Sequence, residues 1–284
     1  MSEEVKFGNL IICGGGGCPQ LENAIGCIKA IQRVRNVKFD YAWGTSAGAI
    51  AASMLMSYEN QDIEKFEKLL RATPISEWFY FCPWQAIKSI FGKSNYVADN
   101  TGLKKALLEY VDGSSVVKVR VSVSEMCNGK FVKSELVDGR PSHVLASMSF
   151  QHIFPPVRIN GVDYGDGGIN DNIPLPSYLN IPKYEHIYLI LAPSMPLLPN
   201  VSKWDFIDRL FNVLDNTMNR EIAQIEQLRL DELPNVTILR PDKWVESASF
   251  LDWSTCFEQV DASYEFACKK LTEGTSTPFP LIGG

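Results

Sequence analysis

The sequence predicts an α/β fold with a mainly parallel central sheet, arranged as a three-layer α/β/α sandwich. Two observations carry this prediction. Short apolar segments of strand length recur along the chain, and segments of helical periodicity separate them from the first strand onward. Such a β-α-β-α alternation at short spacing is typical of parallel sheets whose crossover helices cover the faces.

The first elements follow this alternation. An apolar strand over residues 9–13 runs directly into four glycines, Gly14 to Gly17. Apolar residues at helical spacing over 21–34 then predict an amphipathic helix. A second strand over 38–43 leads through a glycine-containing turn into an apolar segment over 49–56, for which we expect a buried helix.

The middle of the chain adds two helices and a hairpin. Helical periodicity predicts helices over 62–70 and 102–111. Alternating valines predict a half-exposed strand over 117–123. Asn128-Gly129 is typical of a type I′ hairpin turn and predicts a partner strand over 130–135.

The rest of the chain continues the same pattern without an internal repeat or a low-complexity linker. We therefore expect one domain over 8–272, followed by a loose tail over 273–284. The remaining expected elements are a strand over 186–191, a long amphipathic helix over 207–225, a strand over 235–239 and a last helix that ends at Leu271.

Charge argues against a nucleic-acid partner. The chain of 284 residues has 27 basic and 33 acidic side chains and a net charge of −6. No block of Lys and Arg exceeds two residues, so the sequence contains no basic surface signal for DNA or RNA. The same balance gives no long-range attraction to anionic lipid, and peripheral membrane contact would therefore depend on apolar and aromatic side chains.

An aromatic segment over 78–91 offers such side chains. It could form a lid or a lipid-contacting surface, or it could pack into the core, and the sequence leaves both interpretations open. Its aromatic members are Trp78, Phe79, Tyr80, Phe81, Trp84 and Phe91.

The cysteines and the N-terminus indicate a cytoplasmic protein. The seven cysteines are odd in number and no two stand at C-x-x-C spacing, which favours reduced, mostly buried thiols. The first residues are polar and acidic, unlike a signal peptide, and no apolar stretch is long enough to span a bilayer. No cluster of His, Cys or carboxylates predicts a metal site or a cofactor.

The turn Gly44-Thr45-Ser46-Ala47-Gly48 follows a predicted strand and begins a predicted helix. This is a G-x-S-x-G pattern, in which a sharp strand-to-helix turn presents the serine oxygen above the sheet and small neighbours make the turn possible. Ser46 is therefore a candidate nucleophile. The pattern alone also occurs in ordinary βα turns.

The four glycines at 14–17 can point backbone N–H groups at a negative charge. That charge could be a phosphate at a helix N-terminus or the oxyanion of an acyl-transfer intermediate. Neither G-x-G-x-x-G nor a G-K-[ST] ending is present, which disfavours nucleotide binding. A flexible turn remains the alternative.

A third motif places an acidic residue between glycines. Asp166 is flanked by Gly165, Gly167 and Gly168, in the stretch Y-G-D-G-G-I-N-D-N-I-P. A tight loop of this kind can aim a carboxylate, although an Asp-Gly-Gly sequence by itself usually marks a turn.

Together these three motifs, in this order, resemble the patatin-like phospholipase family. That family has a glycine-rich oxyanion loop after its first strand, then a G-x-S-x-G elbow and later a D-G-[GA] loop. The stretch F-P-P-V-R-I-N-G-V-D-Y-G-D-G-G is also similar to the family's approach to its aspartate. The strong resemblance covers 10–56 and 142–174, and a weaker similarity extends to Leu271.

The resemblance implies a function and a site. Ser46 corresponds to the nucleophile, Asp166 to the base that accepts its proton, and Gly14 to Gly17 to the oxyanion hole. Gly44 and Gly48 shape the elbow, and Gly167 and Gly168 shape the aspartate loop. The implied activity is hydrolysis of fatty-acyl esters, with phospholipids as substrate class, through an acyl-enzyme and without catalytic histidine, calcium or other cofactor.

Two alternatives to this function remain open, one because the glycine motif differs from the family pattern and one because the chain contains histidines. The family usually has G-G-G-x-[RK]-G, whereas Gly17 is followed here by Cys18-Pro19-Gln20, so an inactive lipid-binding or regulatory member is one alternative. A Ser-His-Asp esterase is the other. Its histidine would be His143, His152 or His186, but the first two precede Asp166 and the third begins a predicted buried strand.

Overall fold

The computed structural model describes residues 7–81, 96–111, 118–128, 130–175, 183–193, 219, 222, 223, 225, 227–247, 254 and 256–273, the side chain of Phe81 excepted. Within these residues the main sheet has eight strands in the order β10-β9-β1-β2-β5-β8-β7, with β6 paired to β5. The strands are β1 (Leu10–Cys13), β2 (Tyr41–Thr45), β5 (Val119–Cys127), β6 (Lys130–Asp138), β7 (Val157–Ile159), β8 (Val162–Asp166), β9 (Ile187–Ile190) and β10 (Val236–Leu239).

The sheet is mixed, and its parallel part contains the first two strands. β10, β9, β1, β2 and β5 pair in parallel, in register over four residues at each boundary. β6 and β8 run antiparallel to β5, and β7 runs antiparallel to β8. The carboxyl ends of β1 and β2 therefore lie side by side, and the glycine run and the serine turn follow them directly.

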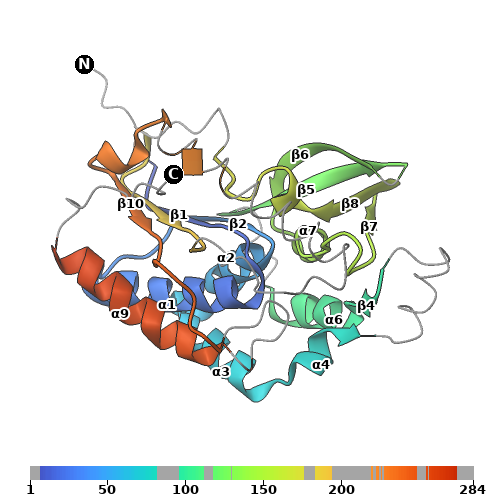
Figure 1. The fold of residues 1–284 in the computed structure, drawn as a ribbon, viewed down its shortest axis with the longest axis horizontal. Helices are drawn as coiled ribbons and strands as arrows, with labels where there is room; N and C mark the ends of the chain where they lie inside the picture. Colours follow the sequence, from blue (N-terminus) through green and yellow to red (C-terminus); the bar gives the residue numbers. More distant parts are fainter. Residues whose placement is uncertain are drawn as a thin grey trace.

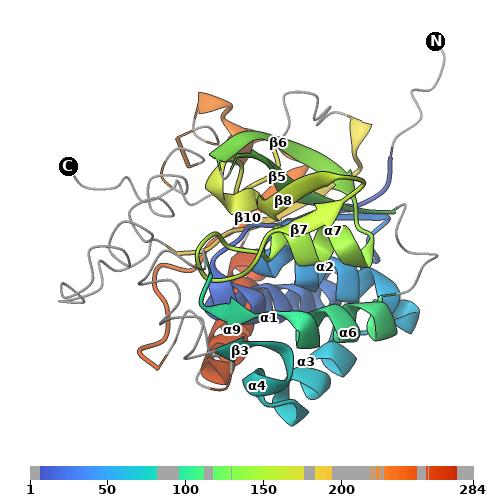
Figure 2. The ribbon, with the colours of Figure 1, turned by 90° about the vertical axis from the view of Figure 1, so that its right-hand side faces the viewer.

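Helices cover one face of this sheet (Figures 1 and 2). α1 and α2 pack against each other and against the parallel strands, and α9 lies along the outer side of α1. The helices are α1 (Gly17–Arg35), α2 (Ala47–Ser57), α3 (Ile63–Ala72), α4 (Ile75–Trp78), α6 (Thr101–Tyr110), α7 (Pro141–Ser147) and α9 (Phe257–Glu273), with short 3-10 turns η1 (Glu59–Gln61), η3 (Gly167–Ile169) and η5 (Leu230–Glu232).

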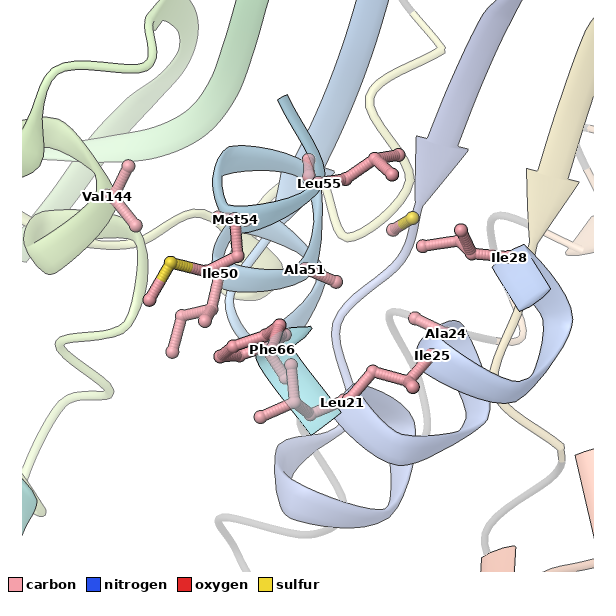
Figure 3. Close-up of a cluster of buried hydrophobic side chains, with 14 of the residues drawn as sticks. Leu21, Ala24, Ile25, Ile28, Ile50, Ala51, Met54, Leu55, Phe66 and Val144 are labelled. Carbon is pink, nitrogen blue, oxygen red and sulfur yellow. The ribbon is translucent and has the colours of Figure 1, made fainter. Parts of the chain in front are cut away.

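The larger core lies between this helical layer and the sheet. Figure 3 shows Leu21, Ile25 and Ile28 of α1 directed toward Ile50 and Leu55 of α2. These side chains are at most 2% exposed, and each buried side chain of this size stabilises the fold by about 1.5–3 kcal/mol. The helical spacing of apolar residues over 21–34 thus predicted the buried face of α1.

A second apolar cluster covers the other face of the parallel strands. Leu10 and Ile12 of β1 point to this side. They pack with Ile225, which is helical, and with Leu230 of η5. Helical residues therefore lie on both sides of the sheet, which makes the fold the predicted α/β/α arrangement around a mainly parallel sheet.

One local prediction needs correction in part. The expected alternation holds where Lys118 and Arg120 are exposed and Val119 and Val121 are buried, but it ends at Ser122. Ser122 and Ser124 are buried beneath the segment that follows Asp166. The aromatic segment begins as core, since Trp78 is 4% and Phe79 is 7% exposed, and they stack against Phe66 and Phe154. The core interpretation therefore applies to these two residues.

Tyr80, in the same aromatic segment, lies at the surface. Tyr80 is 59% exposed at the start of a small two-stranded sheet, β3 (Tyr80–Phe81) with β4 (Ala98–Asp99). Trp84 and Phe91 lie outside the described residues, as does the tail from Gly274 onward.

The packing of α9 on α1 depends on one glycine. A Cβ at Gly26 would clash with the carbonyl oxygen of Val260 and come within 2.9 Å of the Ser263 Cβ. Backbone atoms of α9 occupy this space, and they cannot move aside as a flexible side chain could.

We predict that Gly26→Ala destabilises the protein, by about 1–3 kcal/mol, because the added methyl group must separate α1 from α9. Helix propensity alone predicts the opposite sign, a gain of about 1 kcal/mol. Urea unfolding of the variant and the wild type measures the difference. An unchanged or increased unfolding free energy would contradict close α1–α9 packing.

Candidate active site

Ser46 occupies a strained turn between β2 and α2. Its backbone has φ 52° and ψ −124°, a conformation that costs a non-glycine residue free energy unless the surroundings enforce it. Gly44 and Gly48 permit the turn, because a Cβ on Gly44 would clash with the backbone of Gly48, and one on Gly48 with the carbonyl oxygens of Cys13 and Gly14. The G-x-S-x-G spacing is thus explained by backbone contact on both sides of the serine.

Asp166 lies directly against this serine. The Ser46 hydroxyl donates a hydrogen bond of 2.7 Å to Asp166 Oδ2, across 120 residues of sequence. The other carboxylate oxygen, Oδ1, accepts a 2.7 Å hydrogen bond from the Gly168 N–H, and the Asp166 N–H donates to the Ser149 carbonyl at 3.0 Å. Asp166 ends strand β8, and η3 begins at the next residue, so the aspartate is held by a strand as well as by a turn.

The carboxylate is buried, and burial changes its acidity. Asp166 is 1% exposed. Loss of hydration raises the pKa of Asp166 from 3.8 to about 7, although the hydrogen bonds from Ser46 and Gly168 favour the charged form. Such a carboxyl exchanges its proton near neutral pH, as a general base at a serine hydroxyl requires.

The end of α7 holds the other side of Ser46. The Ser46 N–H donates to the hydroxyl of buried Ser147 at 2.9 Å, and Met148 Sδ lies 3.9 Å from Ser46 Oγ. The motif analysis did not identify these two residues. They belong to the S-M-S-F stretch shortly before the aspartate, and no spacing rule distinguishes them.

The four glycines divide into two pairs. Gly14 and Gly15 are buried, and their N–H groups are used inside the protein: Gly14 donates to the Ile190 carbonyl at 3.0 Å and Gly15 to Asn172 Oδ1 at 3.0 Å. Gly16 and Gly17 are partly exposed, with φ 154° and 69°. Among the described residues, nothing accepts a hydrogen bond from either of their N–H groups.

This division narrows the expected oxyanion site. An N–H group that already has a protein acceptor is less available to a substrate, and the N–H groups of Gly14 and Gly15 are in this position. Gly16 and Gly17 remain as candidate donors. α1 begins at Gly17, and the partial positive charge of its N-terminus adds to their attraction for an anion.

Asn172 joins the glycine run to the aspartate segment. Its side chain accepts from the Gly15 N–H at 3.0 Å and donates to the Gly15 carbonyl at 3.4 Å, across 157 residues of sequence. The neighbouring Asp171 carbonyl accepts from the Thr45 hydroxyl at 3.4 Å. Asn172 stands in the D-G-G-I-N-D-N motif, but no local pattern indicates that its partner is Gly15.

The described histidine contacts favour structural roles. His143 Nδ1 lies 2.7 Å from the Asp138 carbonyl, and His186 Nε2 lies 2.8 Å from the Thr237 hydroxyl. His152 is exposed on the surface. Within the described part of the chain, the partners of the Ser46 hydroxyl are Asp166 and Met148, and no histidine nitrogen is among them.

Cys13, the residue before the glycine run, has a buried thiol. Burial raises the pKa of the Cys13 thiol to about 12, so the cysteine before the glycine run stays protonated.

Over the described ranges, no group of three or more His, Cys, Asp or Glu side chains has the arrangement of a metal site. No helix within those ranges is long and apolar enough to cross a bilayer.

Comparisons with known proteins give a family match. The model of the family described as patatin-like phospholipase matches residues 12–178, more than half of the chain and all of the motifs above. No curated protein sequence matches the chain.

Two solved structures are similar at low identity. VipD from Legionella pneumophila is 14% identical with a TM-score of 0.43, and the alignment covers 93% of this chain and 67% of VipD. A chain of the heterodimeric ExoU–SpcU complex from the type III secretion system of Pseudomonas aeruginosa is 13% identical with a TM-score of 0.33. That alignment covers 94% of this chain and 53% of the other.

The buried carboxyl predicts a stability effect that depends on pH. Between pH 3.8 and about 7 the folded protein keeps a proton on Asp166 that the unfolded chain has lost, so the free energy of unfolding falls as pH rises through this window. The asparagine of Asp166→Asn does not ionise, so the free energy of unfolding of this variant should not fall through this pH window. We expect the variant to be more stable than the wild type at pH 8, by up to about 4 kcal/mol, and nearly equal to it at pH 4. Thermal unfolding at both pH values measures the effect, and a difference that does not vary with pH would refute a buried titrating carboxyl.

Proposed function

The chain belongs to the patatin-like phospholipase family, and we propose that it hydrolyses fatty-acyl esters of phospholipids or related lipids with Ser46 as nucleophile and Asp166 as base. One observation carries the assignment of residues: the 2.7 Å hydrogen bond from the Ser46 hydroxyl to a buried carboxylate, at a strained strand-to-helix turn. Family membership supports the lipid class of the substrate.

Acylation follows from this geometry. Ser46 Oγ attacks the carbonyl carbon of the ester while its proton passes to Asp166 Oδ2, and the carbonyl π electrons move onto oxygen. When the tetrahedral intermediate collapses, the bond to the leaving alcohol breaks and the alkoxide takes the proton from Asp166. The products of this half-reaction are the free alcohol, such as a lysophospholipid, and the acyl ester of Ser46.

In deacylation water is the nucleophile and Ser46 is the leaving group. Water gives a proton to Asp166 and its oxygen attacks the acyl carbon. Collapse of the second tetrahedral intermediate breaks the bond to Ser46 Oγ, which recovers its proton from Asp166 and releases the fatty acid. Both half-reactions use the same carboxylate, so a pKa of about 7 for Asp166 suits both directions of proton transfer.

We assign the oxyanion site to the N–H groups of Gly16 and Gly17. The negative charge on the former carbonyl oxygen is then stabilised by backbone donors and by the N-terminus of α1. Family members usually have a basic residue after this glycine run, and Cys18-Pro19-Gln20 stands here instead. A backbone oxyanion site does not need that positive charge.

We also propose that residues 8–272 form the catalytic domain and act in the cytoplasm or at a membrane surface. β9 and β10 continue the sheet beyond the family match, and α9 packs on α1, which supports one domain to residue 272. Contact with the membrane would be apolar because the net charge is −6. Trp78 and Phe79 are buried, so other side chains would make that contact.

We predict that Ser46→Ala abolishes ester hydrolysis and labelling by a fluorophosphonate probe. For the wild type, kcat/KM should rise with pH to a plateau above about 7, because only the ionised Asp166 accepts the proton. Asp166→Asn should lower kcat by several orders of magnitude. Assays on a short soluble ester from pH 5 to 9 measure all three, and near-wild-type turnover by Ser46→Ala would refute the nucleophile.

Histidine variants serve as matched controls for that experiment. His143→Ala, His152→Ala and His186→Ala should each keep the rate within about tenfold, apart from effects on stability. A loss as large as that of Asp166→Asn in any one of them would favour the Ser-His-Asp esterase. Folded wild-type protein that neither turns over esters nor reacts with the probe would favour the lipid-binding or regulatory alternative.

Turnover should be independent of calcium. The proposed mechanism assigns charge stabilisation to backbone donors and proton transfer to Asp166, so no step requires a metal. Activity on phospholipid vesicles should survive excess EDTA within about twofold. A loss that calcium restores and magnesium does not would show that a metal participates.

A further inference from the structure

We propose that Asn172 is a positioning residue that fixes the direction of the Gly16 N–H by clamping the peptide group before it. This inference rests on the proposed function, since the Gly16 N–H matters to catalysis only if an oxyanion forms beside Ser46. It assigns a role to the last asparagine of the D-G-G-I-N-D-N motif.

The clamp consists of two hydrogen bonds in opposite directions. Asn172 Oδ1 accepts from the Gly15 N–H at 3.0 Å, and Asn172 Nδ2 donates to the Gly15 carbonyl at 3.4 Å. The backbone carbonyl of Asn172 lies 3.4 Å from the same N–H group. Asn172 is 5% exposed, so water does not compete for these bonds as it would at a surface.

Peptide geometry transfers this constraint to Gly16. The Gly15 carbonyl and the Gly16 N–H belong to one planar trans peptide group, in which they point in opposite directions. A bond that holds the Gly15 carbonyl toward Asn172 therefore turns the Gly16 N–H away from Asn172. Gly16 needs such a constraint, because glycine is the residue with the least conformational preference of its own.

The clamp also lies next to the nucleophile. A Cβ at Gly15 would clash with Asn172 Oδ1 and would come within 3.0 Å of the Ser46 Cβ. On the other side, a Cβ at Gly168 would lie 2.9 Å from Asn172 Oδ1 and 3.1 Å from Asp166 Oδ1. The Asn172 amide thus sits between the glycine run, the serine and the turn that holds the base, and one side chain aligns the oxyanion donor with both.

The test uses Asn172→Ala and Asn172→Leu, with Asn170→Ala as the matched control. Leucine keeps the branched shape of the asparagine side chain but makes neither hydrogen bond, so it fills the cavity that alanine would leave. Asn170 lies in the same loop, and its amide donates to the Ser124 hydroxyl of β5 at 3.3 Å rather than to the glycine run. Asn170→Ala therefore changes the loop without opening the clamp.

The first measurement is independent of activity. In amide hydrogen exchange followed by NMR, the Gly15 N–H should exchange at least tenfold faster in both Asn172 variants than in the wild type and in Asn170→Ala. Equal exchange in all four proteins would show that the clamp does not hold the glycine run in solution, and would overturn the inference.

The second measurement separates positioning from folding. A misdirected oxyanion donor weakens binding of the transition state and not of the substrate, so kcat should fall roughly 10- to 100-fold while KM changes less than about threefold. A trifluoromethyl ketone, which forms a tetrahedral oxyanion on Ser46, should lose affinity by the same factor as kcat/KM. The corresponding alkyl ether, which forms no oxyanion, should bind each variant as it binds the wild type.

The outcomes distinguish the two proposals. An active wild type whose Asn172 variants keep kcat and inhibitor affinity overturns the role of Asn172 alone. Equal loss of ketone and ether affinity also overturns it, because a general loss of folded sites would explain the data. A wild type that hydrolyses no ester and does not react with the ketone overturns the proposed function, and with it the catalytic part of this inference.

Discussion

The organisation of this site depends on one buried hydrogen bond, between a serine hydroxyl and a carboxylate that water does not reach. Burial of a charge without a partner is costly, so the carboxylate of Asp166 must be surrounded by donors. The Ser46 hydroxyl and the Gly168 N–H, each at 2.7 Å, fulfil this need. The same burial raises the pKa of Asp166 to about 7, so the folded protein loses stability as the pH rises toward neutral and this carboxylate ionises.

The site brings three segments together at the carboxyl ends of β1 and β2. β1 and β2 are adjacent and parallel, so the glycine run and the serine turn leave the sheet together. β8 reaches the same place from the other side of β5, running antiparallel to it. Polar side chains then fasten the segments to each other: Ser147 to the Ser46 N–H, and Asn172 to both polar groups of Gly15. These contacts restrict the movement of the serine and its neighbours, as the proposed catalysis requires.

The parts of this arrangement that the sequence could predict are those encoded by local spacing. The β1-α1-β2-α2 unit follows from apolar periodicity, and the turn at Ser46 follows from the glycines two residues on either side of it. The burial of Ser122 and the contact of Asn172 with Gly15 depend on residues far apart in the chain, so no local pattern contains them. The aromatic segment was ambiguous for a related reason: Trp78 and Phe79 would suit a lipid surface equally well, and only their packing against Phe66 and Phe154 decides for the core. Likewise, four consecutive glycines look equivalent in sequence, and only their hydrogen bonds separate Gly14 and Gly15 from Gly16 and Gly17.

The close seating of α9 against Gly26 has a consequence for how the protein is made. Synthesis proceeds from the N-terminus, so α1 leaves the ribosome more than two hundred residues before its partner helix does. During that interval the side of α1 that will receive α9 has no cover, and both Ser46 and Asp166 are made before α9 is. Contacts between such distant segments form slowly and expose apolar surface in the meantime. The contact between α1 and α9 can therefore form only after Phe257 to Glu273 have been made, late in the synthesis of the chain.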